Sequence, residues 1–452
     1  MNKKDKLEFE TIKSHKNRLY FLCGFVCVVI LLIVLITNHS LAKYRTTESI
    51  PLINGTINYT SYDLKMVAMY QEENGDYKSI DTVPTSGYSL NEEKSYCEVN
   101  DTKDNNITIE YQNGVINFLG MPKKGTKCYL YFDEQILAKD IILANSKINE
   151  GEPDFSQVAT TDEGIYKAED DWGESYYFRG DVTNNWIKFA GYYWRIIRIN
   201  GDGSIRLIYN GTGTATTGTS TQISTSAYNS SYYDNAYVGY MYGSTGASSY
   251  AATYANTNNS TIKGVLDNWY QTNITNKGYG DKVSKEAGFC NDRKISTVNR
   301  SGYGTLGYGT NATVYAPVDR FLNASWSWLS TQNPTLKCSQ LSNDMFTVSG
   351  SSKGNKALAN PVGLITADEV VFAGGKGGTN NSSYYLYTGQ NYWTMSPFDF
   401  YDGHADVFFV HSNGNLNYSN VYGAIGVRPV INIASNVTIK SGDGTISNPY
   451  VI

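Results

Sequence analysis

Asn391-Tyr-Trp-Thr-Met-Ser-Pro397, Asp406-Val-Phe-Phe-Val-His-Ser-Asn-Gly-Asn-Leu-Asn-Tyr418 and Gly426-Val-Arg-Pro-Val-Ile-Asn-Ile433 are the stretches that decide the fold of the C-terminal part of the chain. Residues 407–410 are continuously apolar, which is typical of a strand buried on both faces. Asn413-Gly414 lies between two β-rich runs and predicts a type I′ turn, because both central positions of that turn need positive φ. The sequence therefore predicts a β-hairpin here.

The residues around this hairpin are aromatic or carry compact polar groups, whereas Trp393, Val407 and Phe409 are expected to lie beneath them as buried support. Aromatic and small polar side chains on a rigid scaffold provide contact area at low entropic cost, as in antibody paratopes. We therefore expect a ligand-binding surface made of Tyr401, Asp402, His404, Asp406, His411, Asn413, Asn415, Asn417, Tyr418, Asn420 and Tyr422.

Tyr392-Trp-Thr-Met-Ser-Pro397 together with Gly426-Val-Arg-Pro-Val-Ile-Asn432 resembles the C-terminal signature of bacterial domains with a C-type-lectin-like fold. That group includes formylglycine-generating-enzyme-like domains and the variable ligand-binding proteins of diversity-generating retroelements. The resemblance implies a C-type-lectin-like α+β ligand-binding domain over residues 171–452. Several hairpin residues are types that randomising an adenine-rich Asn codon can produce. The hairpin is thus either genetically diversified or an invariant surface rich in Asn and Tyr.

Composition predicts a mainly β protein with minor α. The chain has 452 residues, enough for two or three domains, and its 38 Tyr and 42 Gly favour many short strands and turns. Charged residues make up only 17% and the net charge is −5, so the chain has no basic patch for nucleic acid.

Residues 19–37 are uncharged and rich in Leu, Val and Ile, and a helix of this length spans a hydrocarbon core of about 30 Å. More positive charge precedes this transmembrane helix than follows it. The positive-inside rule then predicts a cytoplasmic tail at residues 1–18 and a single-pass cell-membrane protein with its C-terminal bulk extracellular. Cleavage as a signal peptide near Ala42 is the alternative.

The cysteines beyond this span fall into two local pairs. Cys97 and Cys128 bracket one β-rich segment, and Cys290 and Cys338 bracket another in the later domain. We expect a disulfide within each pair, because an even number of cysteines suits an oxidising exterior; free thiols are the alternative. The sequence has no Cys-x-x-Cys motif and no Cys/His ligand cluster, so neither a metal nor a cofactor is expected.

Residues 50–138 show the alternation of strands, and Asn113-Gly114 separates two such runs. This pattern predicts a small β-sandwich, which resembles Ig-like or camelysin-like stalk domains and is expected to be a spacer. Residues 139–170 are charged and contain Gly151-Glu-Pro153, which predicts a linker.

Two helices are predicted in the later domain. Apolar residues recur at helical spacing over residues 262–269, after Ser260 or Thr261 as N-cap. The other helix starts after Thr366 and carries Asp368 and Glu369 in its positive first turn, which explains these carboxylates without acid–base catalysis. The glycine-rich stretch 374–378 that follows is predicted to be a flexible loop.

Catalysis is not expected. A formylglycine-generating activity needs a reactive cysteine pair, whereas a structural disulfide explains Cys290 and Cys338 better. A Ser/His/Asp hydrolase would have to use His404 or His411, and the chain has no Gly-x-Ser-x-Gly elbow. The sequence predicts a non-catalytic, adhesin-like binding protein for an extracellular protein or glycan. The alternatives are a purely structural envelope protein and a formylglycine-generating-enzyme-like oxidoreductase relative.

Overall fold

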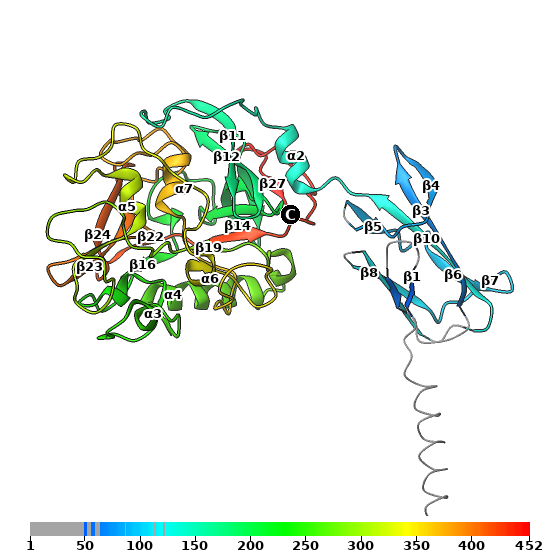
Figure 1. Cartoon of the computed structure of the whole chain (residues 1–452). Coiled ribbons are helices and arrows are strands. Elements are labelled where there is room, and N and C mark those ends of the chain that lie inside the picture. The colour runs from blue at the N-terminus through cyan, green and yellow to red at the C-terminus, as the bar shows by residue number, and fades with distance from the viewer. Residues whose placement is uncertain (1–48, 52–55, 59–63, 86, 113, 121–122) are drawn as a thin grey trace, which may run out of the picture. The chain divides into compact units, whose positions relative to one another are not determined.

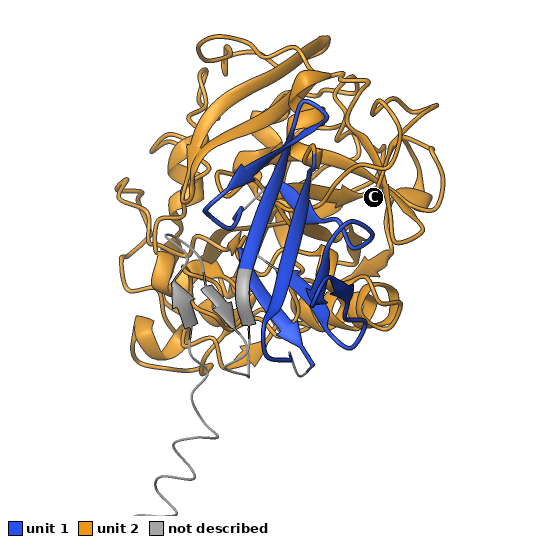
Figure 2. Cartoon of the chain, turned by 90° about the vertical axis from the view of Figure 1, so that its right-hand side faces the viewer, with its two compact units in different colours: residues 1–135 blue, residues 136–452 orange. Residues whose placement is uncertain are grey.

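The computed structural model describes residues 49–51, 56–58, 64–85, 87–112, 114–120 and 123–452, and it divides the chain into two compact units, residues 1–135 and 136–452 (Figures 1 and 2). The protein is mainly β with minor α, as predicted. The expected tail at residues 1–18 and transmembrane helix at residues 19–37 lie outside the described residues. In the ranges just given, no helix is both long and apolar enough to cross a membrane.

Both predicted disulfides form, Cys97–Cys128 in the first unit and Cys290–Cys338 in the second. Disulfides form and persist in oxidising environments. They therefore indicate an extracellular or secreted protein.

The first unit contains two β-sheets, of strand order β1-β2-β9-β8 and β4-β3-β10-β6-β7, with β5 also paired to β10 (Figure 1). The strands are β1 Ser49–Pro51, β2 Thr56–Asn58, β3 Leu64–Glu73, β4 Asp76–Ile80, β5 Tyr88–Leu90, β6 Tyr96–Val99, β7 Thr102–Lys103, β8 Thr108–Gln112, β9 Val115–Leu119 and β10 Thr126–Glu134.

One core joins the two sheets of this unit. Alternation along β10 buries Leu130 and Phe132 on one face, where they share a core with Ile116 and Phe118 of β9 in the other sheet. Burying one such side chain contributes roughly 1.5–3 kcal/mol. The predicted hairpin of β8 and β9 is present; Asn113 of its turn lies outside the described residues.

The second unit contains two larger sheets. One has the order β11-β12-β14-β13-β27, with β15 joining β14 to β26; the other has the order β16-β25-β22-β23-β24, with β20 beside β22. The strands are β11 Asp162–Asp170, β12 Gly173–Gly180, β13 Trp186–Phe189, β14 Tyr192–Ile199, β15 Ile205–Tyr209, β16 Ser224–Ser226, β20 Thr313–Val314, β22 Tyr392–Tyr401, β23 His404–Val410, β24 Leu416–Asn420, β25 Ile425–Val427, β26 Val430–Ile433 and β27 Tyr450–Val451. Two short pairs complete the strands: β17 Met241–Tyr242 with β18 Asn258–Asn259, and β19 Phe289–Cys290 with β21 Met345–Phe346.

Short helices and loops surround these sheets (Figure 1). The α-helices are α2 Ala138–Ala144, α3 Tyr250–Thr253, α4 Thr261–Tyr270, α5 Ala316–Phe321, α6 Leu341–Asp344 and α7 Ala367–Phe372; the other helical turns are η1 Thr219–Thr221, η2 Asn235–Val238, η3 Gln271–Thr275 and η4 Gly280–Lys282. Both predicted helices are confirmed. The Ser260 hydroxyl caps α4, and Thr366 forms a capping box with Glu369 at the start of α7.

The segment 139–170 is not the predicted linker. It contains α2 and β11 and belongs to the second unit, where Ile142 and Ile165 are buried in the core. Most charged residues of β11 lie on its less buried positions, while the alternate positions face the protein. Charged residues that suggested a linker therefore lie in β11, which is an edge strand of its sheet.

Candidate functional site

The predicted hairpin forms from β23 and β24, but its turn is not type I′. Of the two turn residues only Gly414 has positive φ, 82°, and its N–H donates to the His411 carbonyl at 2.8 Å. The first residue pair of the strands is Val410 with Leu416, so the loop is longer than the two residues of a type I′ turn.

The type I′ geometry occurs one turn earlier, between β22 and β23. Tyr401 pairs with His404, and the two residues between them, Asp402 and Gly403, both have positive φ, 48° and 78°. Asp-Gly is a favoured sequence for this turn. The C-terminal strands therefore form two successive hairpins. Trp393, Val407 and Phe409 are buried in them, as predicted.

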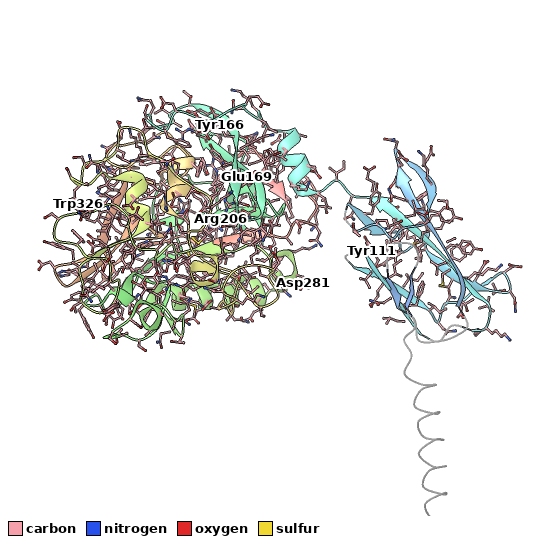
Figure 3. The ribbon with its side chains drawn as sticks, in the orientation of Figure 1. Tyr111, Tyr166, Glu169, Arg206, Asp281 and Trp326 are labelled. Atoms are coloured by element: carbon pink, nitrogen blue, oxygen red, sulfur yellow. A yellow bond between two sulfur atoms is a disulfide. The ribbon has the colours of Figure 1, made fainter. Side chains whose placement is uncertain are left out.

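An open depression of about 440 Å³ lies beside these hairpins; we call it the aromatic groove. Trp326, labelled in Figure 3, is one of its walls. The lining residues are Tyr303, Leu322, Trp326, Trp328, Phe398, Asp399, Asn417 and Tyr418.

The rings of the groove hold one another in place. The Tyr418 ring stacks on Phe398 with a centroid distance of 3.7 Å, and Tyr303 stacks on Tyr401 at 4.8 Å. Trp326 contacts both groups, at 5.1 Å from Tyr303 and 5.9 Å from Phe398. Each aromatic pair adds about 0.5–1.5 kcal/mol beyond its buried area, so the walls are ordered before a ligand arrives.

One carboxylate, Asp399, lines the groove, and a second, Asp406, faces it across two strands. Asp399 is only 5% exposed and faces Asp406 directly across β22 and β23. Its Oδ2 accepts a hydrogen bond of 2.9 Å from the Tyr303 hydroxyl. Burial and the charge of Asp406 raise the pKa of Asp399 to about 8, and burial raises the pKa of Asp406 to about 6 although His404 opposes it. The pair therefore gains and loses its protons to solvent near neutral pH.

The glycine-rich loop after α7, predicted to be flexible, packs against Trp328 of the groove wall. A Cβ atom on Gly377 would lie 2.1 Å from the Trp328 ring, and one on Gly378 would lie 2.4 Å from it. Only residues without a side chain allow the backbone to approach the indole this closely.

Other predicted site residues form a second aromatic surface, which we call the Tyr232 surface. The His404 ring stacks on Tyr232 at 5.2 Å, and the Tyr422 ring packs against Tyr232 at 4.8 Å. Tyr422 is 52% exposed, and Tyr233, whose ring packs against Tyr232, is 58% exposed. Tyr418 and Tyr422, expected in one surface, thus contact different partners.

The predicted asparagines mainly shape the backbone. The Oδ1 atoms of Asn413, Asn417 and Asn420 accept hydrogen bonds from nearby backbone N–H groups, at 3.2, 2.9 and 3.3 Å. Asn415 donates to the side chain of Asn380 at 3.2 Å. His411 is half-buried at the same loop, with its ring 5.9 Å from that of Phe409. Asn417 alone of these also lines the aromatic groove.

Asp368 and Glu369 do more than complement the dipole of α7. Glu369 pairs with Arg198 at 3.0 Å and with Arg206 at 2.5 Å, and Asp368 pairs with Arg320 at 2.6 Å. Burial acts to raise the pKa of Glu369, but the charges of Arg206 and Arg198 outweigh it and the pKa is lowered. These carboxylates are compensated charges of the core, which agrees with a structural role.

Sequence reasoning missed most of the groove walls. The signal available was Ser325-Trp-Ser-Trp328, two large aromatics two residues apart in a polar loop, together with Asp399 between Phe398 and Phe400. Neither observation shows by itself that these segments meet beside Tyr418.

Across the described ranges, no three His, Cys, Asp or Glu side chains are grouped in a way that could hold a metal ion. Comparison of the chain with protein-family models, with curated proteins and with solved structures finds no match.

Proposed function

We propose that this chain is a non-catalytic binding protein of the cell surface, anchored through residues 19–37, whose second unit is a C-type-lectin-like domain that binds an extracellular glycan or protein. The aromatic groove carries this proposal. It combines an open volume, ordered aromatic walls and a small number of polar groups, which is the usual composition of a ligand site.

Two further observations support binding without catalysis. Cys290 and Cys338 are joined in a disulfide, so neither supplies the thiol that formylglycine generation requires. The ring of His404 packs on Tyr232 and that of His411 near Phe409, and the nearest polar partner of the His404 ring is the Asp402 carbonyl at 2.8 Å. No serine nucleophile is bonded to either ring in the described part of the chain.

The proposal is tested by screening the full chain against glycan and peptide arrays, beside the variants Tyr418→Ala, Tyr422→Ala and Tyr233→Ala. We expect Tyr418→Ala to weaken binding about tenfold or more, because it removes a groove wall. Tyr233→Ala is the control for the groove, because Tyr233 is an exposed tyrosine that does not line it. Loss with Tyr422→Ala, with or without loss in Tyr233→Ala, while Tyr418→Ala still binds would move the site to the Tyr232 surface, and no binding to either array would favour the structural envelope protein.

Membrane topology has its own test. Protease treatment of intact cells should remove the second unit, because positive charge precedes residues 19–37 and disulfides form and persist in oxidising environments. Full protection of that unit in intact cells, with digestion after lysis, would contradict the orientation.

A further inference from the structure

Asp399 differs from every other buried carboxylate of the second unit, all of which the structure describes. The others form ion pairs with arginine or, in Asp234, accept backbone N–H bonds of 2.8 and 2.7 Å from Ala236 and Gly246. The side chain of Asp399 has one hydrogen-bond donor, the uncharged Tyr303 hydroxyl. Asp399 therefore lacks the positive partner that this fold gives to its other buried acids.

The neighbouring Asp406 also lacks a positively charged partner. Its Oδ1 is buried and has no hydrogen-bond partner, and the residue forms no ion pair. The nearest compensating charges are indirect: Arg300, which is already paired with Asp319 at 2.7 Å, and His404, which is stacked on Tyr232. Two facing acids without a cation repel one another when both are ionised, so a positive group placed beside them favours their ionised forms and gains free energy.

The walls around these acids are suited to one kind of positive group. Aromatic faces attract organic cations, and this attraction compensates most of the hydration energy that the cations lose on binding. Sugars and neutral peptides bring no positive charge to the two carboxylates. A guanidinium would bring five N–H donors to a groove with few free acceptors, because Asp399 Oδ2 already accepts from the Tyr303 hydroxyl and Asn417 Oδ1 from the Tyr418 backbone N–H. An alkylated ammonium needs few or no hydrogen-bond acceptors.

We propose that the aromatic groove binds an alkylated ammonium group of an extracellular ligand, with the positive charge against Asp399, which Asp406 faces across β22 and β23, and the methyl or methylene groups on Trp326, Tyr303 and Tyr418. This inference rests on the proposed binding function and specifies its ligand class. The shared chemistry has two sources, a choline-type headgroup and an alkylated lysine side chain.

The test is calorimetric titration of the full chain, in a detergent without ammonium or sugar headgroups, with choline and with trimethyllysine. The neutral isostere 3,3-dimethylbutanol replaces the nitrogen of choline by carbon and controls for shape. We expect both cations, or the one whose source is correct, to bind, and the neutral alcohol to bind at least about tenfold more weakly.

Two variants locate the binding site. Asp399→Asn keeps the acceptor for Tyr303 and should weaken cation binding at least about tenfold, because it removes the charge. Asp281→Asn is the matched control, since Asp281 is an exposed acid of the second unit that neither lines the groove nor belongs to the expected binding surface. Equal binding of choline and its neutral isostere, or unchanged binding by Asp399→Asn, would overturn the inference.

The two proposals fail in different ways. If neither cation binds while array binding is retained and depends on Tyr418, the binding function stands and the ligand class is wrong. If cations bind without dependence on Tyr418 or Asp399, the groove is not the cation site. If array binding also does not depend on Tyr418, the groove is not the site of the array ligand.

Discussion

At the scale of single residues, the chain tolerates Asp399 because its surroundings shift its proton equilibrium. A buried carboxylate with no cationic partner is costly when ionised, and the pKa of about 8 means that Asp399 carries its proton at pH 7. Tyr303 then holds a neutral acid. The proposed cation would favour the ionised form of Asp399, because an opposite charge nearby lowers the pKa of a carboxyl group.

The pH dependence of stability should reveal this proton. The folded-state pKa of Asp399, about 8, lies above the unfolded value of 3.8, so its contribution to stability is complete below pH 3.8 and is lost as pH rises through 8. Asp406, with a pKa of about 6, acts in the same direction. We expect the free energy of unfolding to fall by a few kcal/mol, on the order of 1.4 per pKa unit, between pH 5 and pH 9.

Urea unfolding of the Asp399→Asn variant at pH 5, 7 and 9 measures this effect. The variant should lose most of the alkaline decrease, and Asp399→Asn with Asp406→Asn should lose more of it. Arg300 and His404 are unchanged in both proteins, and Asp402→Asn, an exposed acid, should behave as the wild type. Parallel stability curves for Asp399→Asn and wild type would show that Asp399 is not protonated in the folded protein.

Removal of the Trp393 side chain should destabilise the second unit. Its side chain is fully buried, its Nε1 donates to the Ser226 carbonyl at 2.9 Å, and its ring packs against Tyr228 at 5.8 Å. Trp393→Ala should reduce the free energy of unfolding by about 3–5 kcal/mol. Tyr233→Ala should change it by less than about 0.5 kcal/mol, because that side chain is exposed. Similar losses in chemical denaturation would contradict this difference.

At the scale of elements, the two hairpins of β22, β23 and β24 position the groove, and their turns differ in what they tolerate. Gly403 and Gly414 both have positive φ, 78° and 82°. A Cβ atom on Gly403 would meet nothing within 4 Å, whereas one on Gly414 would lie 1.7 Å from the Asn381 carbonyl oxygen. Gly403 is needed only because its φ is positive, whereas Gly414 is needed for its positive φ and because a side chain there would clash with the Asn381 backbone.

Alanine substitutions separate these two requirements. Gly403→Ala should cost about 1–2 kcal/mol, the penalty of a left-handed L-residue. Gly414→Ala adds a backbone clash to the same penalty, so it should be clearly more destabilising. Thermal unfolding of the two variants measures the difference, and equal midpoints would mean that the loop around Asn381 moves without cost.

Elements with strong local signals were predictable from the sequence, and contacts between distant segments were not. The period over residues 262–269 and the Thr366 cap are local patterns, and both helices form. Asp402-Gly403 and Asn413-Gly414 both match the rule for a type I′ turn, but strand register decides which of them occupies a two-residue loop. The groove joins rings from four separate segments, and tertiary packing alone places Trp326 beside Tyr418.

At the scale of the whole molecule, each unit has its own core and its own disulfide. Leu130 and Ile116 belong to one core, and Trp194 and Trp393 belong to the other. A unit that satisfies its own apolar surface unfolds as its own cooperative structure. We therefore expect two unfolding transitions in the full chain.

The tryptophans make these transitions separable, since all 7 of them, Trp172, Trp186, Trp194, Trp269, Trp326, Trp328 and Trp393, lie in the second unit. The double variant Cys97→Ser/Cys128→Ser opens a loop with a sequence separation of 31 residues and should destabilise the first unit by about 3–4 kcal/mol in the chain-entropy model. Tryptophan fluorescence should then show an unchanged transition while circular dichroism, which reports on both units, shows an earlier one. The matched variant Cys290→Ser/Cys338→Ser, with a separation of 48, should instead shift the fluorescence transition. If the first variant shifted the fluorescence transition as far as the second, the two units would unfold as one, and the first would stabilise the groove-bearing unit instead of only carrying it.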